Sequence, residues 1–310
     1  MENFKTAIYI EDKALFDYAA SAARLMSDES FEHGYRCANA LQQSMAMIKR
    51  CHAVVEKRCG DLPDPPAACQ WLLDNMYMAK REYICALPAL RQQKKLPACK
   101  DGAIILCLCR SLLYASQGRI DKDRCRLFLD GFQSVRVLSR GELELFPAAM
   151  RAVILEALAK TSKELCSAVD TAPLEESFSS LFGSLRLLSV MDMEKLIAAA
   201  DVSSAILSAD PSGEYPLMDS DSKAQYLKRL SRIAKQQRCR EHEAAAMLIK
   251  QAKQQDIHVG FLLFSQEQGN KELWYIGANF ALSLFIPCIL LCILTAPPRR
   301  CCFCCRYRSL

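Results

Sequence analysis

The stretch GELELFPAAMRAVILEALAKTSKELCSAV, from Gly141 to Val169, decides the fold. Its composition is that of a helix, because alanine, leucine and glutamate dominate it and it contains no glycine after the first position. The run therefore predicts one long helix. Proline is tolerated in the first turn of a helix, so Pro147 is expected to mark the first turn of the main part.

Helical patterns continue on the N-terminal side of this stretch. Residues 12–26 repeat apolar side chains at a period of 3.6, from Leu15 to Ala23. The run 35–60 keeps that period and is expected to end at Gly60, because glycine is the usual C-terminal cap of a helix. Both segments predict helices that present one apolar face.

Prolines mark the next breaks in the chain. Three of them interrupt residues 61–68, and the helix predicted for residues 69–87 is expected to end before Pro88. The best candidate for a strand is the short run HVGFLLF at residues 258–264, and no longer alternating pattern occurs. The sequence therefore predicts an all-α fold, built as a bundle-like domain of many helices.

Composition limits the class of protein. Of the 310 residues, 51% are hydrophobic, which is enough for a core and excludes a disordered chain. The formal charge of +5 does not by itself imply nucleic acid as a partner. Many of the 17 cysteines lie in apolar helical runs, as Cys107 and Cys109 do, and no apolar leader precedes them. We expect reduced thiols in the cytosol.

One segment predicts a transmembrane helix. Residues 274–296 carry no charge over 23 positions, and at 1.5 Å per residue such a helix is about 34 Å long. Interfacial aromatics, Trp274 and Tyr275, stand at one end, and Arg299 and Arg300 at the other. Flanking arginines favour a cytosolic tail, but large domains follow this rule poorly. We expect the helical domain in the cytosol.

These patterns divide the chain into four parts. We expect N-terminal helices at residues 1–60 and a helical domain at residues 61–265. A transmembrane helix follows at residues 274–296, and an arginine- and cysteine-rich tail at residues 297–310. The tail contains the spacing C-x-x-C, as in Cys301 and Cys304, which metal sites and acylated cysteines share. An interrupted reading frame is the other interpretation of this tail.

The stretch DPSGEYPLMDSDSKAQY, Asp210 to Tyr226, reads as an acidic connector between two helices. Either Asp219 or Asp221 is expected to cap the helix that follows. The opposite face of that helix is basic and is interpreted as a solvated face or as a surface for anionic lipid. The acidic residues of the loop therefore have conformational roles rather than catalytic ones.

Several blocks in a fixed order together resemble the N-terminal region of cyclic β-1,2-glucan synthases and their glycoside-phosphorylase-linked relatives. The blocks include W-L-L-D-N, the Q-x-V and G-E-L segment, S-L-R-x-L-S, D-P-x-G-x-Y-x-x-M-D and H-V-G, and they cover roughly residues 66–264. The chain departs from the family pattern at Glu144, Lys223 and Leu227. The matched positions, expected to be structural, are Trp71, Asp74, Asn75, Gln133, Gly141, Glu142, Arg186, Asp210, Pro211, Gly213, Tyr215, Met218, Asp219, Tyr226, His258 and Gly260.

The resemblance implies a supporting role rather than chemistry. In that family a membrane glycosyltransferase domain and a phosphorylase-like domain follow the first membrane helices, and this chain ends just beyond its first apolar span. We expect no catalytic residue, cofactor or metal in it. The implied partners are membrane lipid and a downstream or separate glycosyltransferase or phosphorylase domain, and not nucleic acid. The alternative is a membrane-anchored helical adaptor unrelated to carbohydrate.

Direct signs of catalysis are weak. None of the four histidines has metal-ligand spacing with another. The acidic pairs Glu142 with Glu144, and Asp219 with Asp221, could be imagined as glycosidase carboxylates. Side chains two positions apart on a helix do not face each other, so neither pair is expected to act.

Overall fold

The computed structural model describes residues 9–26 and 30–264, and this part is mostly helical. The predicted all-α class is confirmed for it. The α-helices are α1 Asp12–Leu25, α2 Gly34–Cys59, α3 Ala67–Gln92, α4 Ile104–Ala115, α5 Lys122–Gln133, α6 Arg140–Ser167, α7 Ala172–Val190, α8 Met193–Ala200, α9 Val202–Leu207, α10 Ser220–Gln237 and α11 Glu241–Gln255. A short 3₁₀ helix, η2, spans Tyr215–Leu217.

Helix α6 is the long helix predicted by the opening stretch, and it lies at the centre of the fold. It packs against α2, α3, α4 and α7, and most of its 28 residues are buried. It begins at Arg140, seven residues before Pro147, so the expectation that Pro147 marks a first turn is wrong. A capping box explains the earlier start, because Ser139 accepts from the Glu142 N–H and Glu142 accepts from the Ser139 N–H.

Helix α3 also differs from the prediction, because it continues through Pro88 to Gln92. A proline inside a helix removes a hydrogen bond and costs about 3 kcal/mol. Ala86 and Leu90 are fully buried on either side of it, and we attribute the continuation to this packing. Helix α2 ends as predicted before Gly60, although this glycine has a right-handed φ of −62° and not the left-handed cap conformation.

Three short strands depart from the all-helical prediction. They are β1 Ser30–Glu32, β2 Leu96–Cys99 and β3 Gly102–Ala103, which form an antiparallel sheet in the order β1-β2-β3. The Ala103 N–H donates to Glu32 Oε2 (2.8 Å), which ties the two outer strands together. Strands of two to four residues are too short for an alternating pattern to predict them. The predicted strand candidate is not one, since residues 259–264 are helical.

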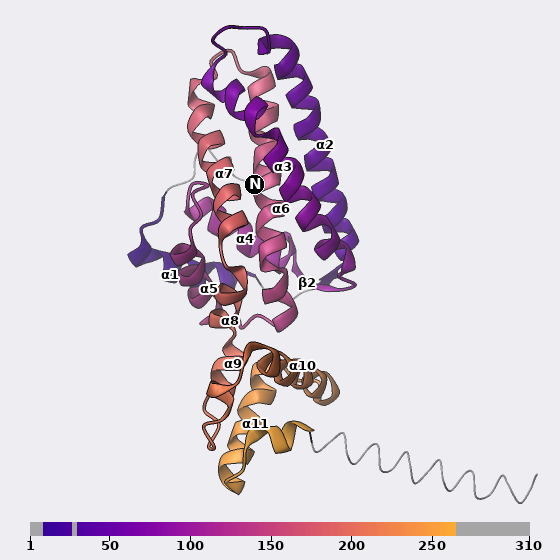
Figure 1. Cartoon of the computed structure of the whole chain (residues 1–310), viewed down its shortest axis with the longest axis vertical. Helices are drawn as coiled ribbons and strands as arrows, with labels where there is room; N and C mark the ends of the chain where they lie inside the picture. The colour runs from indigo at the N-terminus through magenta and orange to yellow at the C-terminus, as the bar shows by residue number, and fades with distance from the viewer. Residues whose placement is uncertain (1–8, 27–29, 265–310) are drawn as a thin grey trace, which may run out of the picture.

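The buried side chains form two separate cores. The larger core joins α1 to α8, and we call this part, residues 9–26 and 30–200, the body. The smaller core joins α9 to α11 and the helical residues that follow, and we call residues 202–264 the C-terminal unit. Figure 1 shows α2, α3, α6 and α7 along the long axis, with the C-terminal unit beyond one end. Helices α2 and α3, on either side of the predicted boundary at residue 60, share the larger core.

Asp201 is the residue between the two cores. It ends α8 and caps α9, because its side chain accepts from the Ser204 N–H (3.1 Å). Gln133, one of the positions that carry the resemblance, donates to the Ala200 carbonyl (2.8 Å) and fixes the end of α8. The connection between body and C-terminal unit is therefore short and held by hydrogen bonds.

The predicted transmembrane helix lies outside the described residues, as does the tail at 297–310. Within residues 9–26 and 30–264, the helices are all too short or too polar to cross a membrane. The described cysteines are free, and Cys107 and Cys109 are buried in α4 as their apolar setting predicts. Burial raises the pKa of the Cys125 thiol to about 12, so this thiol stays protonated near neutral pH.

Truncating a central side chain of α6 tests the fold. Leu158 is fully buried, so Leu158→Ala is expected to lower the free energy of unfolding by about 2–5 kcal/mol. Urea unfolding followed by circular dichroism measures the change. Leu25, at the end of α1, is 81% exposed, and Leu25→Ala is the matched control, with an expected change within about 0.5 kcal/mol. Equal losses for both variants would contradict the central position of α6.

Candidate functional site

Asp210 is the centre of a hydrogen-bond network in the C-terminal unit. Its side chain is fully buried, and its Oδ1 accepts from the Val259 N–H (2.9 Å). Its Oδ2 accepts from the Ser212 hydroxyl (2.5 Å) and lies 2.5 Å from His258 Nδ1. Asp210 therefore binds a segment 48 residues further along the chain, beyond the loop in which it lies.

The network continues from His258 to Tyr226. The Tyr226 hydroxyl lies 3.0 Å from His258 Nε2, on the far side of the ring from Asp210. Since a carboxylate only accepts, Nδ1 carries a proton and donates to Asp210. We call Asp210, Ser212, Tyr226 and His258 the polar network. It joins the 210–226 loop and α10 to the last described helical residues.

Gly260 makes this close approach possible. A Cβ atom at Gly260 would lie 2.5 Å from the Tyr226 hydroxyl and 2.8 Å from His258 Nε2, closer than atoms can approach. Gly213 serves the loop instead, because its φ of +69° is a conformation that glycine adopts at little cost. Its N–H donates to the Asp210 carbonyl (3.0 Å), which closes the turn.

The electrostatics of the network favour an ionised Asp210 and a neutral Tyr226. Burial alone would raise the pKa of Asp210, but hydrogen bonds from Ser212, Val259 and His258 outweigh it and lower that pKa. Burial, followed by the charge of Asp210, raises the pKa of Tyr226. The carboxylate thus stabilises the fold above its unfolded pKa of about 3.9, and this contribution is lost as pH falls through the lower folded value.

Aromatic rings cover the Tyr226 end of the network. The ring centroids of Tyr215 and Phe264 lie 5.7 and 5.2 Å from that of Tyr226. Tyr215 is fully buried, and its hydroxyl lies 3.1 Å from the Ser204 hydroxyl of α9. A phenol with a raised pKa, packed among rings, is poorly suited to act as a nucleophile. The network is therefore suited to lock loop, α10 and the 258–264 segment together.

A second feature lies where the C-terminal unit meets the body. The Arg140 N–H, at the start of α6, donates to Glu241 Oε2 of α11 (2.7 Å), and the Ser231 hydroxyl of α10 donates to Glu241 Oε1. We call this contact, together with Asp201, the joint. Burial raises the pKa of the Asp201 carboxyl there. Gly141 lies beside the contact, and Glu142 behind it is buried against Arg136 (3.1 Å).

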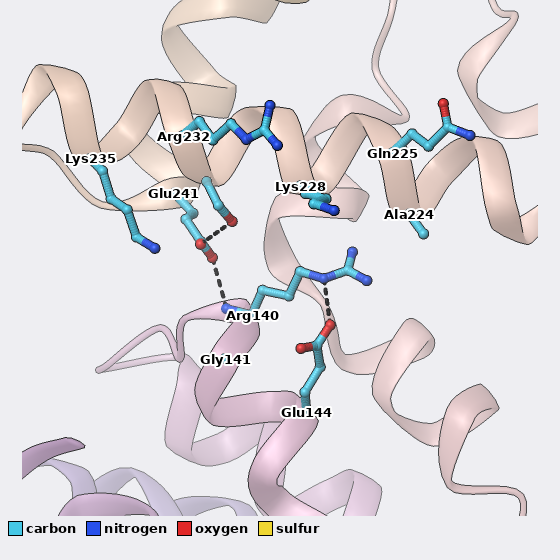
Figure 2. A pocket seen from close by; sticks show the side chains of 10 residues that line it. Arg140, Gly141, Glu144, Ala224, Gln225, Lys228, Arg232, Lys235 and Glu241 are labelled. Atoms are coloured by element: carbon cyan, nitrogen blue, oxygen red, sulfur yellow. Dashed lines mark hydrogen bonds and ion pairs between the residues drawn. The ribbon is translucent and has the colours of Figure 1, made fainter. Parts of the chain in front are cut away.

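A groove opens at the joint between the first turn of α6 and one face of α10. Figure 2 shows Arg140 at the start of α6, across from the basic side chains of α10, of which Arg232 points away from Arg140. These are Lys228, Arg232 and Lys235, which occur at helical spacing. The groove also contains Glu144, whose Oε1 accepts from Arg140 Nε (2.6 Å). Positive charge from both parts of the chain therefore faces one space.

The remaining positions that carry the resemblance lie apart from both features. Trp71 and Asn75 lie on α3, where the Trp71 ring stacks near Phe182 with 6.5 Å between centroids. The Asn75 amide donates to the Trp71 carbonyl (3.0 Å). Asp74 on α3 and Arg186 on α7 are exposed. These four positions belong to the surface and packing of the body.

The loop positions have local roles. Pro211 is exposed, and Met218 packs partly buried against the smaller core. Asp219 caps α10, as one of the two predicted alternatives, and its Oδ1 accepts from the Ser222 N–H (2.9 Å). This bond comes first among the causes that lower the pKa of Asp219. Asp221 is exposed in the first turn of the same helix.

The two carboxylates of the pair Glu142 and Glu144 lie in different surroundings. Glu142 is buried and binds Ser139 and Arg136, whereas Glu144 is exposed and pairs with Arg140. Their side chains therefore have different partners. Within the described residues, no group of three histidine, cysteine or acidic side chains is placed to hold a metal ion.

Sequence reasoning missed Ser212, Arg140 and Glu241. Ser212 gave no signal, since a serine in a loop is common. The basic face of α10 was visible from its helical spacing, but its partner across the groove was not, because Arg140 and Lys228 lie 88 positions apart. Only the docking of the two cores brings them together.

Comparison with known proteins gave two negative results: no protein-family model matches this chain, and no curated protein matches it. The resemblance therefore rests on the ordered sequence blocks alone. In the C-terminal unit those blocks supply Asp210, Tyr215, Tyr226, His258 and Gly260, which lie together around the polar network.

Removing His258 tests the polar network. His258→Ala removes one of the three hydrogen-bond donors of the buried Asp210 carboxylate, so we expect the C-terminal unit to lose about 1–3 kcal/mol of stability. The measurement is thermal unfolding with limited proteolysis, which should cut first within residues 202–264. His242→Ala, in the same unit but outside the network, is the control and should behave as wild type. Similar losses in both variants would show that the network does not hold the unit together.

Proposed function

We propose that this chain is a non-catalytic, membrane-tethered helical region that supports or regulates a membrane glycosyltransferase of the cyclic β-1,2-glucan synthase kind. It acts in cis within a longer protein or by contact with a separate one. Residues 274–296 anchor it in the inner membrane, with the helical body on the cytosolic side. The chain itself transfers no sugar.

One observation carries this proposal. Five of the sixteen positions that match the family blocks lie up to 50 residues apart in the sequence, from Asp210 to Gly260, and yet surround the polar network. Their convergence supports a shared design for this unit, and its interlocked side chains suit a structural role.

The position of the network supports a coupling role. Phe264, the last described residue, packs edge-on against the Tyr226 ring, and the predicted anchor begins ten residues later at Trp274. Tyr226 in turn lies on α10, which forms one wall of the groove at the joint. A displacement of the anchor would thus reach the network first and the body next.

Reconstitution with a truncated synthase tests the proposal. A cyclic β-1,2-glucan synthase that lacks its own N-terminal region is co-expressed with the full chain, and transfer of labelled glucose from UDP-glucose is measured in membranes. We expect the chain to co-purify with the synthase and to raise the transfer rate. His258→Ala should weaken both effects, because it loosens the unit next to the anchor, and His242→Ala should not.

The full chain expressed alone is the negative control, and labelled glucose incorporated by it would contradict the non-catalytic role. Failure to co-purify, together with an unchanged transfer rate, would contradict the link to the synthase. That second result would favour the adaptor unrelated to carbohydrate.

A further inference from the structure

The groove at the joint has the size of a small-ligand site. Its volume is about 570 Å³, and its walls come from α6, α10 and the start of α11. Sites for small molecules commonly range from about 300 to 1,000 Å³. The walls belong to two different cores, so the site exists only when the C-terminal unit is docked on the body.

Cations outnumber carboxylates in this groove. Four basic side chains, Arg140, Lys228, Arg232 and Lys235, face two acidic ones, Glu144 and Glu241. Both carboxylates are occupied, since Glu144 accepts from Arg140 and Glu241 accepts from the Arg140 N–H and the Ser231 hydroxyl. Glu241 is thus committed to holding the joint, and Glu144 is committed to an ion pair with Arg140 within α6.

The two lysines of the groove, unlike its two carboxylates, are not engaged by other side chains of the described residues. Lys228 and Lys235 are exposed, and neither ammonium has a hydrogen bond or ion pair with the described residues. They project from the face of α10 opposite its buried residues, Leu230 and Ile233. An ammonium is a strong donor with three protons, so these groups are available to a ligand.

An isolated basic helix face would be an ordinary solvated surface. Here Arg140, from the other core, adds its charge to the same space, although like charges brought together destabilise a docked arrangement. An anion bound between them would remove that repulsion. Arginine and lysine together suit phosphate, because the guanidinium binds its oxygens in a fork and the ammonium adds a point charge.

We propose that this groove binds a ligand with clustered phosphate oxygens, of which a diphosphate group is the simplest form. Lys228 and Lys235 contact it from α10, and Arg140 contacts it from α6. Its binding ties the C-terminal unit to the body at the joint. The phosphate group belongs to a soluble molecule or to a lipid headgroup, and both share this chemistry.

Calorimetric titration of the full chain, kept in mild detergent at low ionic strength, tests the proposal with inorganic pyrophosphate as the probe. The double variant Lys228→Glu/Arg232→Glu is expected to lower the affinity about tenfold or more, because it places negative charge beside the anion. The double variant Lys250→Glu/Lys253→Glu, on exposed positions of α11, changes the net charge equally. It should leave the affinity unchanged.

Glycerol phosphate, titrated in the same way, distinguishes the two sources. Tighter binding of glycerol phosphate assigns a lipid headgroup, and tighter binding of pyrophosphate assigns a soluble ligand; either supports the groove. The milder variant Lys228→Gln/Lys235→Gln, checked for its native helical spectrum, should also weaken binding. No binding of either probe, or equal weakening by the α10 and α11 variants, would overturn the proposal.

Discussion

The burial of α6 is the constraint on which the rest of the structure depends. Most of this helix is enclosed by α2, α3, α4 and α7, so the charged residues on its packed faces must be paired. Arg151 binds the buried Glu82 of α3 (2.7 Å), and Glu156 binds Arg110 of α4 (3.0 Å). Glu82 is buried, so breaking its pair with Arg151 costs several kcal/mol, and both pairs help to fix how α3 and α4 lie along α6. The first turn of α6, held by its capping box, then projects from the end of the body as the docking point for the C-terminal unit.

The polar network and the joint have different roles in the C-terminal unit. The polar network makes the C-terminal unit rigid, because a buried carboxylate with three donors is stable only while all three stay in place. The joint needs only a few hydrogen bonds, and it leaves a charged groove open between the cores. A rigid unit on a lightly held joint is suited to transmit a displacement from one end of the chain to the other.

The sequence predicted those parts of the fold that local pattern determines. The length and composition of α6 were sufficient to predict it, and Asp219, one of the two aspartates predicted to cap α10, does cap it. The predicted end of α3 before Pro88 was wrong because the burial of Leu90 outweighs the cost of a proline inside a helix. The resemblance named Asp210 and His258 but not their contact, since 48 intervening residues give no local signal. The groove was hidden for the same reason, because it forms only when two separately folded cores meet.

Two cores, one built on α6 and one on the polar network, meet at the joint. Amide hydrogen exchange of the full chain, read by mass spectrometry of peptides, tests this arrangement most directly. We predict that amides in the middle of α6 exchange slowest of all described segments, and that those of α10 exchange earlier in a separate step. Exchange of α6 and α10 together in one cooperative opening, or faster exchange of α6, would contradict it.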